Sequence, residues 1–181
     1  MTAITSTTPI PAGTTWAADK VHSNVGFAVK HMVVSTFRGR FEKFDATLTD
    51  GKLVGTVDVG SIVVKDENLA AHLQSPEFFD AERHPELRFE STEIRRTGEG
   101  DEVVVDGELT IKGITKPVEA RGTLEGPAVT FGDVNKVGLT LEAIIDRTEF
   151  GLNWNAPLPK GGFALANDVK LIVELELAEQ A

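Results

Sequence analysis

Apolar and polar residues alternate along most of this chain, which is the pattern of β-strands with one buried face. Residues 102–111, 135–146 and 167–178 show it most clearly, because nearly every second position holds Val, Leu, Ile, Ala or Gly and the positions between them are mostly polar. About eight such segments follow one another through short turns, without helical crossovers of ten residues or more. The pattern therefore excludes a parallel α/β sheet and predicts an all-β, antiparallel chain.

Eight antiparallel strands of this length fit either a sandwich or a closed barrel. Closure is favoured by a shift in the apolar phase between Phe37–Phe41 and Phe44–Leu48, since a β-bulge bends a strand. It is also favoured by glycines at inward positions (Gly39, Gly107 and Gly122) and by the lack of a proline-interrupted edge strand. We predict an eight-stranded antiparallel barrel, with an interior that side chains fill or that holds one small ligand.

One stretch, residues 66–89, interrupts the alternation. Asp66 is suited to cap a helix over residues 67–74, with Leu69 and Leu73 on one face. We expect that face to lie on the mouth of the barrel. The prediction is a short helical insertion near residues 66–84.

The second half of this insertion contains two prolines and a pair of phenylalanines. Ser75 before Pro76 predicts a second helix start, and Pro85 predicts the end of the insertion. Phe78 and Phe79 are adjacent, so a short turn cannot hide both on one face. At least one of them is expected to enter the barrel or line its opening.

Composition narrows the class of protein. The chain has 181 residues, of which 41% are hydrophobic and 25% charged, and it has no cysteine. Disulfides, thiolate metal sites and thiol nucleophiles are therefore excluded. We predict one domain over residues 15–181 after a flexible tail over residues 1–14, which is rich in Thr, Pro and Ala.

Charge and hydropathy restrict the partners and the compartment. The net charge of −10 disfavours nucleic acid and anionic membranes unless a basic patch exists, and the lysines and arginines look scattered along the sequence. No window reaches the ~18 apolar residues of a membrane span, and residues 1–15 hold neither the positive charge nor the apolar run of a signal peptide. We therefore expect no integral membrane segment and a cytoplasmic location.

Four blocks of sequence carry a resemblance to a known family. HSNVGFAVKHMVVSTFRGRF, HLQSPEFFDAERHPELRFEST, GELTIKGITKPVE and DRTEFGLNWN are similar, in order and spacing, to the YceI-like family of lipocalin-like proteins that bind polyisoprenoid lipids. The resemblance covers residues 15–177. It implies an extended lipocalin-like barrel, an apolar channel for a long isoprenoid chain such as a polyisoprenoid or an isoprenoid quinone, and a homodimer. Leu69 and Ala70 stand where the family commonly has an Arg-Asp pair.

The interior side chains are the candidate ligand-binding residues. Ten phenylalanines and no tyrosine suit a hydrocarbon better than a polar metabolite. Arg147 would either bind a lipid head group or pair with a neighbouring carboxylate at the surface, and the Gly- and Pro-rich residues 155–168 would form a flap over one end. The candidate set is Phe27, Val29, Phe41, Phe44, Phe78, Phe79, Phe89, Leu139, Leu141, Arg147, Phe150, Trp154, Leu171 and Val173.

Two other readings stay open. A hydrolase would use His72 or His84 with Asp80 and a serine nucleophile, although no nucleophile elbow is present. A structural or interaction module would have a barrel filled by side chains. The histidines show no metal-binding spacing, so we predict no metal site, no catalytic residue and no cofactor other than a bound lipid.

Overall fold

A computed structural model describes residues 13–98 and 100–181. The predicted tail, residues 1–14, lies almost entirely outside the described residues. The strands are β1 (Thr15–Ala18), β2 (Asn24–His31), β3 (Ser35–Phe41), β4 (Phe44–Thr49), β5 (Lys52–Asp58), β6 (Ile62–Val63), β7 (Glu86–Arg96), β8 (Glu102–Ile111), β9 (Ile114–Val129), β10 (Asn135–Asp146) and β11 (Leu165–Glu179). The helices are α1 (Glu67–Gln74) and the 3₁₀ turns η1 (Val59–Ser61), η2 (Phe131–Asp133) and η3 (Arg147–Phe150).

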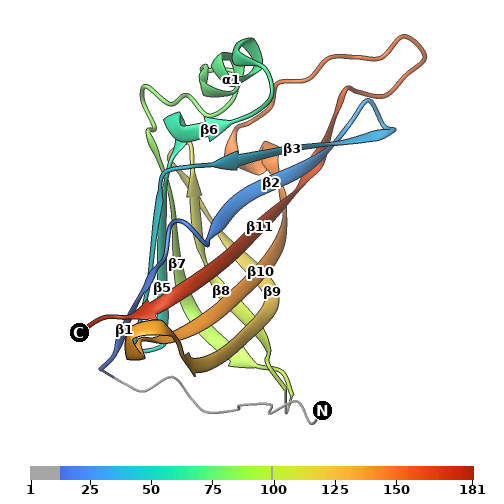
Figure 1. The fold of residues 1–181 in the computed structure, drawn as a ribbon. Helices are drawn as coiled ribbons and strands as arrows, with labels where there is room; N and C mark the ends of the chain where they lie inside the picture. Colours follow the sequence, from blue (N-terminus) through green and yellow to red (C-terminus); the bar gives the residue numbers. More distant parts are fainter. Residues whose placement is uncertain (1–12, 99) are drawn as a thin grey trace.

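Eight of these strands form a closed ring. Their order is β1-β4-β5-β7-β8-β9-β10-β11, and β1 pairs with β11 to complete the ring. The pairings are all antiparallel, and the long strands wind around a common interior (Figure 1). The predicted eight-stranded antiparallel barrel is confirmed.

The barrel is extended at one end by β2, β3 and β6. β11 pairs with β1 through Leu177–Glu179 and with β2 through Leu165–Glu174, so β1 and β2 share one edge of β11. The chain then leaves β3, which pairs with β2 and β6, and enters β4, which pairs with β1 and β5. The predicted phase shift between Phe41 and Phe44 marks this change of partner.

The β-branched run over residues 53–64 reads as a single strand in the sequence, but η1 divides it into β5 and β6. The Asp58 carboxylate accepts a hydrogen bond from the Gly60 N–H (2.9 Å), and the Ser61 hydroxyl donates to the Asp58 carbonyl (2.7 Å). These local bonds compete with the strand ladder. The division lets β6 pair with β3 while β5 stays in the ring.

The insertion begins as predicted and then departs from the prediction. The Asp66 carboxylate accepts a hydrogen bond from the Leu69 N–H (2.9 Å) and so caps α1. Ser75 ends α1 instead of starting a second helix, since its hydroxyl donates to the His72 carbonyl (2.6 Å). Residues 76–79 are turns rather than helix, and β7 begins directly after Pro85.

The buried side chains form two adjoining clusters along the barrel. One surrounds Trp16 and Leu177 at the end where β1 and the C-terminus lie, and the other lies under α1 (Figure 1). The inward positions predicted for β8, β10 and β11 supply about half of the first cluster and a third of the second. Trp16 is 1% exposed and belongs to the first cluster, so apolar side chains fill this end of the barrel.

Gly122 shows how closely the strands of the ring approach one another. A Cβ atom at this position would lie 1.7 Å from the Thr140 carbonyl oxygen on β10, whereas one at Gly138 would meet nothing within 4 Å. We expect Gly122→Ala to lower the free energy of unfolding by about 1–3 kcal/mol through overpacking. Gly138→Ala, the control on the neighbouring strand, should be neutral or stabilise by about 0.5 kcal/mol. Urea unfolding measures both, and equal effects would contradict this packing.

A charged cluster fastens the β1–β2 connection to β10 and β11. His22 Nδ1 lies 3.0 Å from Asp19 and 3.5 Å from Glu176, and Lys136 Nζ lies 3.1 Å from Glu176. The hydrogen bond between the Asp19 and His22 side chains lowers the pKa of Asp19 to about 2 and raises the pKa of His22.

This cluster predicts a pH-dependent contribution to stability. The His22 contribution is complete below its unfolded pKa of about 6.5 and is lost as pH rises through the raised folded pKa. The Asp19 contribution is complete above about pH 4 and is lost as pH falls toward 2. Thermal unfolding of His22→Asn should therefore differ most from wild type near pH 5 and converge with it at alkaline pH. A difference that does not vary with pH would contradict the pairing.

Candidate ligand-binding cavity

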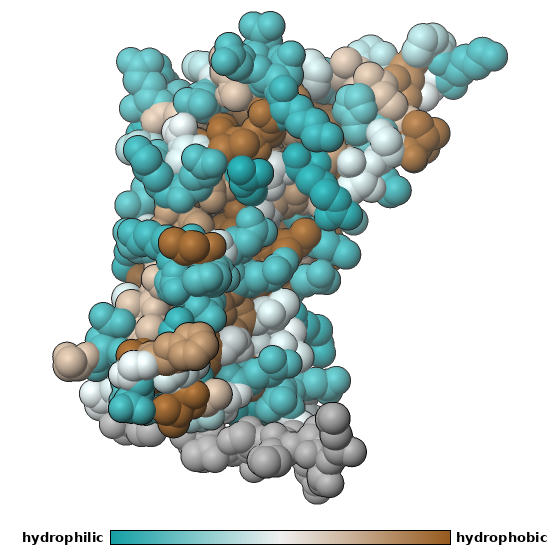
Figure 2. Space-filling view, in the orientation of Figure 1, coloured by the Kyte–Doolittle hydropathy of each residue, from teal (hydrophilic) through white to brown (hydrophobic). Residues whose placement is uncertain are grey.

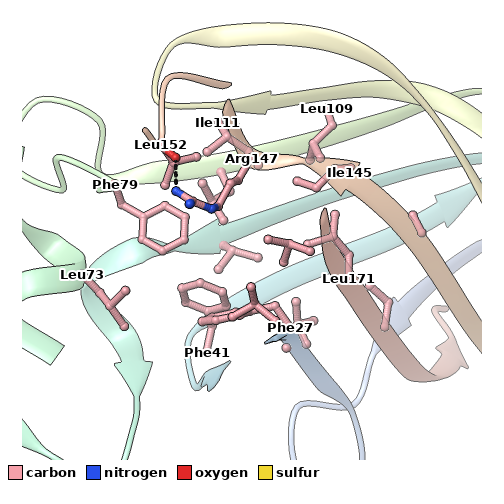
Figure 3. Close-up of a pocket in the computed structure, with 18 of the residues that line it drawn as sticks. Phe27, Phe41, Leu73, Phe79, Leu109, Ile111, Ile145, Arg147, Leu152 and Leu171 are labelled. Carbon is pink, nitrogen blue, oxygen red and sulfur yellow. Dashed lines mark hydrogen bonds between the residues drawn. The ribbon is translucent and has the colours of Figure 1, made fainter. Parts of the chain in front are cut away.

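A cavity of about 610 Å³ occupies the interior of the barrel. Its wall comes from β2–β5 and β7–β11, and it continues from α1 toward the Trp16 end as far as Leu53 and Leu175. Leu69 and Leu73 of α1, with Phe78 and Phe79 of the following turns, line its α1 end. The expected contact of the insertion with the barrel mouth is confirmed, and Figure 3 shows Leu73 and Phe79 beside the aromatic wall.

Most of the candidate residues lie along this cavity. They come from six strands, from the insertion, from η3 and from the chain after it, so the fold brings together positions that are far apart in sequence. Those that line it are Phe27, Val29, Phe41, Phe44, Phe78, Phe79, Phe89, Leu141, Arg147, Trp154, Leu171 and Val173.

Two candidates, Leu139 and Phe150, do not line the cavity. Both are 1% exposed and belong to the packed core. Leu139 faces inward as expected, but it packs in the cluster around Trp16, where side chains fill the barrel. Phe150 lies in η3, where the chain turns away from the ladder, and its ring packs in the cluster under α1. The alternation of apolar and polar residues shows which side chains face inward, but it does not show where side chains fill the barrel interior.

Several cavity residues were missing from the candidate set. Leu109 and Ile111 follow the inward phase of β8, and Ile145 and Val169 follow that of β10 and β11, so the same alternation could have found them. Leu152 lies beyond η3 in an irregular segment. No periodic signal marks its position.

Phenylalanine rings shape the cavity wall by covering glycines. Phe27 lies over Gly39 of the paired strand, where a Cβ atom would come within 2.5 Å of the ring. Phe89 covers Gly107 in the same way, at 2.4 Å. The rings of Phe27 and Phe41 are 6.0 Å apart. These glycines leave room for rings to lie flat against the sheet, which keeps the centre of the barrel open.

Arg147 is the one buried charged residue that lines the cavity among the described residues. Its Nε donates to the Ala166 carbonyl (2.8 Å), and Nη1 donates to the carbonyls of Leu152 (2.5 Å) and Trp154 (2.9 Å). Burial lowers its pKa, and Nη2 has no hydrogen-bond partner within the described part of the chain. The expected alternative of a surface ion pair is wrong, since Arg147 is 5% exposed. Its head-group role stays a prediction.

His72, one of the two histidines of the hydrolase hypothesis, has structural partners. His72 Nε2 lies 2.6 Å from Glu77, and its ring packs edge-on against Phe78 and Trp154 with centroids 4.9 Å apart in each pair. The Ser75 hydroxyl donates to the His72 backbone, and the Ser23 hydroxyl accepts from the Glu176 N–H. Neither serine is therefore hydrogen-bonded to an imidazole. These contacts give the hydrolase reading no support.

One cluster has the ligand types of a metal site. Ligand atoms of Asp19, His22 and Glu176 lie within 4.8 Å of one another. The Lys136 ammonium, however, lies 3.6 Å from Asp19 and 3.1 Å from Glu176. This position already holds a positive charge, so the cluster is explained as an ion-pair network.

The fold and the cavity define a closed antiparallel β-barrel with a mainly apolar interior cavity. The YceI-like domain model matches residues 16–177. The chain belongs to the YceI-like family. The Staphylococcus epidermidis protein UPF0312 SERP2314 is 32% identical to it over 171 residues, which cover 88% of this chain and 95% of that protein.

Solved structures share the fold. Burkholderia cenocepacia BcnA matches with a TM-score of 0.74 and 25% identity, over 88% of this chain and 98% of that one. A polyisoprenoid binding domain from Saccharophagus degradans matches with a TM-score of 0.68 and 11% identity, over 92% and 98% of the two chains. No helix in the described residues has the length and apolar character needed to cross a membrane.

Substitution of Arg147 tests its structural role at the cavity. Arg147→Met keeps much of the side-chain volume but leaves three backbone carbonyls without their donors, so we expect a loss of about 2–4 kcal/mol in the free energy of unfolding. The segment 152–166 should also become more sensitive to protease. Arg83→Ala, the control at a side chain 82% exposed, should change stability by less than about 0.5 kcal/mol. Unchanged stability of Arg147→Met would contradict the structural role.

Proposed function

We propose that this protein binds one long apolar lipid chain inside the barrel, and sequesters or carries it without catalysis. The observation that carries the proposal is the cavity itself, which lies between the ring strands, β2, β3 and the insertion and is lined mainly by Phe, Leu, Val and Ile side chains. Lipid-sized cavities of this kind are lined predominantly by apolar groups. An isoprenoid chain is the first ligand to test, since a domain of the same fold from S. degradans is a polyisoprenoid binding domain.

Burial of hydrocarbon is sufficient to hold such a ligand. Each buried CH₂ group contributes about 0.8 kcal/mol, so ten carbons contribute about 8 kcal/mol. Association costs about 4–15 kcal/mol in lost freedom of motion. A chain of ten carbons therefore barely binds, whereas one of twenty leaves a surplus. This arithmetic favours long chains and places specificity in the length and shape of the cavity.

The ligand's polar end is proposed to lie at the α1 end, next to Arg147. The opposite end of the cavity is apolar, with Leu53 and Leu175 in its wall and the Trp16 cluster beyond it. Nη2 of Arg147 is a buried donor with no partner among the described residues, and a head-group oxygen would satisfy it. The atom is occluded in this structure, so that bond requires a neighbouring side chain to shift.

Cavity-filling variants test the proposal. Ala143 lines the cavity, while Ile144, the next residue on β10, is 59% exposed on the outer face. We expect Ala143→Phe to reduce bound lipid at least tenfold, because the added ring occupies the ligand's space, and Ile144→Phe to leave it unchanged. Native mass spectrometry of the proteins as purified, followed by organic extraction, measures the bound lipid.

The outcomes of this experiment separate the alternatives. A wild-type protein without any bound or extractable lipid, even after incubation with a polyisoprenoid, would favour the structural module. Turnover of an ester substrate that His72→Ala abolishes would favour a hydrolase. The cytoplasmic location, the homodimer and the domain limits of 15–181 stay predictions.

A further inference from the structure

An exposed apolar surface lies beside the α1 end of the cavity. The turn between β2 and β3 exposes 45% of Met32, 69% of Val33 and 85% of Val34, and the segment before β11 exposes 60% of Phe163. We call these four residues the hairpin–loop surface. Figure 2 shows apolar side chains where this hairpin and loop project from the barrel, at the upper right.

The two segments of this surface are joined by backbone pairing. The Met32 N–H donates to the Ala164 carbonyl (2.7 Å), and His31 is the ladder partner of Leu165. Phe163 in turn forms an isolated bridge with Pro157. The side chains of the turn and of Phe163 are therefore held at one corner of the molecule.

The sequence of the β2–β3 turn is not one that would be chosen for the stability of the folded protein. Met32 and Val33 both adopt positive φ angles, of 52° and 69°. The turn has three residues, since His31 pairs with Ser35. Positive φ angles in hairpin turns favour Asn, Asp and Gly, as the Asp50-Gly51 turn of the same protein illustrates. A β-branched residue in the left-handed region is a strained choice. An exposed valine there costs conformational energy without gaining burial within the described chain.

Charge distinguishes this corner from the rest of the protein. Residues 24–41 and 151–167 contain no Asp or Glu, although the chain as a whole carries −10. Lys30, Arg38 and Arg40 share the outer face of the β2–β3 hairpin, as their ladder partners Thr36, Ala28 and Gly26 show. Lys160 is exposed on the loop. The lysines and arginines that look scattered in the sequence thus include a basic group on one arm of the fold.

Most of these cations lack a carboxylate partner. Within the part of the chain that the structure describes, Lys30, Arg38 and Lys160 form no ion pair, and Arg40 lies 3.5 Å from Glu42, with both side chains more than half exposed. Solvated pairs of this kind contribute little. The positive charge is available to an anionic partner.

The hairpin–loop surface is continuous with the cavity. His31, Met32, Ser35 and Phe37 line the cavity, and Leu165 lines it from the other segment. Met32 therefore belongs both to the exposed tip and to the cavity wall. An apolar molecule that leaves the cavity along this wall emerges at the tip of the hairpin.

We propose that the hairpin–loop surface docks on an anionic lipid bilayer, with Val33, Val34 and Phe163 entering the apolar boundary while Lys30, Arg38 and Lys160 contact the head groups. Apolar anchors flanked by basic residues are the chemistry of reversible membrane-surface binding. This inference rests on the proposed function for its purpose, since docking would bring the cavity to the source or destination of its lipid. The docking itself is measurable without any ligand.

Vesicle co-sedimentation tests the docking. The protein should bind vesicles of equal parts phosphatidylcholine and phosphatidylglycerol, bind phosphatidylcholine vesicles much more weakly, and lose affinity as salt rises. Lys30→Gln with Arg38→Gln should weaken binding about 25-fold, at about fivefold for each basic residue. Val34→Asp or Phe163→Asp should weaken it about tenfold or more, since each removes an apolar anchor. All four positions are solvent-exposed, so folding measured by circular dichroism should be preserved.

Phe131→Asp is the matched control. Phe131 is 101% exposed, and its turn η2 joins β9 to β10 at the end of the barrel where the C-terminus lies, far from the hairpin (Figure 1). This variant should bind like wild type. Equal binding to neutral and anionic vesicles, an equal loss in Phe131→Asp, or no vesicle binding by wild type would each overturn the proposal.

Two further results separate membrane docking from self-association and from lipid binding in the cavity. If light scattering shows a dimer that Val34→Asp dissociates, and no vesicle binding is seen, the surface is an interface between copies of this chain and the proposal is wrong. If native mass spectrometry finds no lipid in the protein but vesicle binding follows the expected pattern, the docking surface stands and the proposed cavity function fails. Unchanged lipid content in Val34→Asp, with vesicle binding lost, supports both.

Discussion

The pairing of β1 with β11 is the constraint on which the rest of this structure depends. It involves three residue pairs, Trp16 with Glu179, Ala17 with Ala178 and Ala18 with Leu177, and it closes an otherwise open sheet into a ring. Trp16 and Leu177 are at most 1% exposed beneath these pairs, so burial of large apolar side chains stabilises a short ladder. Closure also removes the free edges that β1 and β11 would otherwise present.

The same closure produces a cavity at the other end. Because β1 is short, the remaining edge of β11 is taken by β2, and β3 and β6 extend the wall beyond the ring. β6 is two residues long, and the chain leaves it for α1. Leu69 and Leu73 of α1 cover the interior where the sheet ends. The barrel is filled at the Trp16 end and hollow under α1, which is the shape that an elongated ligand requires.

Much of this architecture could be predicted from the sequence. Period-two alternation identified the inward faces of β8, β10 and β11, and the Asp66 cap predicted the start of α1. The division of the β5–β6 segment was missed. Asp58 and Ser61 interrupt it through side-chain hydrogen bonds, but in the sequence they look like ordinary polar positions of a β-branched strand. Ser75 was predicted to start a second helix, whereas it ends α1. A Ser-Pro pair is compatible with either end of a helix.

The sequence predicted which side chains face the barrel interior, but not which of them line the cavity and which fill the core. Alternation told that Leu139 points inward, but whether a side chain lines a cavity or fills a core depends on Trp16, which is more than 120 positions away in the chain. Arg147 was recognised as unusual, but two of its three carbonyl partners, Leu152 and Trp154, lie in an irregular segment without periodicity. The basic arm around Lys30 and Arg38 was overlooked because net charge averages over surfaces that the fold keeps apart.

The most direct test of lipid binding in the barrel is a crystal structure of the protein purified without delipidation, after incubation with a polyisoprenoid lipid. We expect continuous density along the cavity, with the polar end near Arg147 and the chain directed toward Leu175 and the Trp16 end. A barrel whose interior side chains have closed the cavity, or one that holds only ordered water there, would contradict the proposed function.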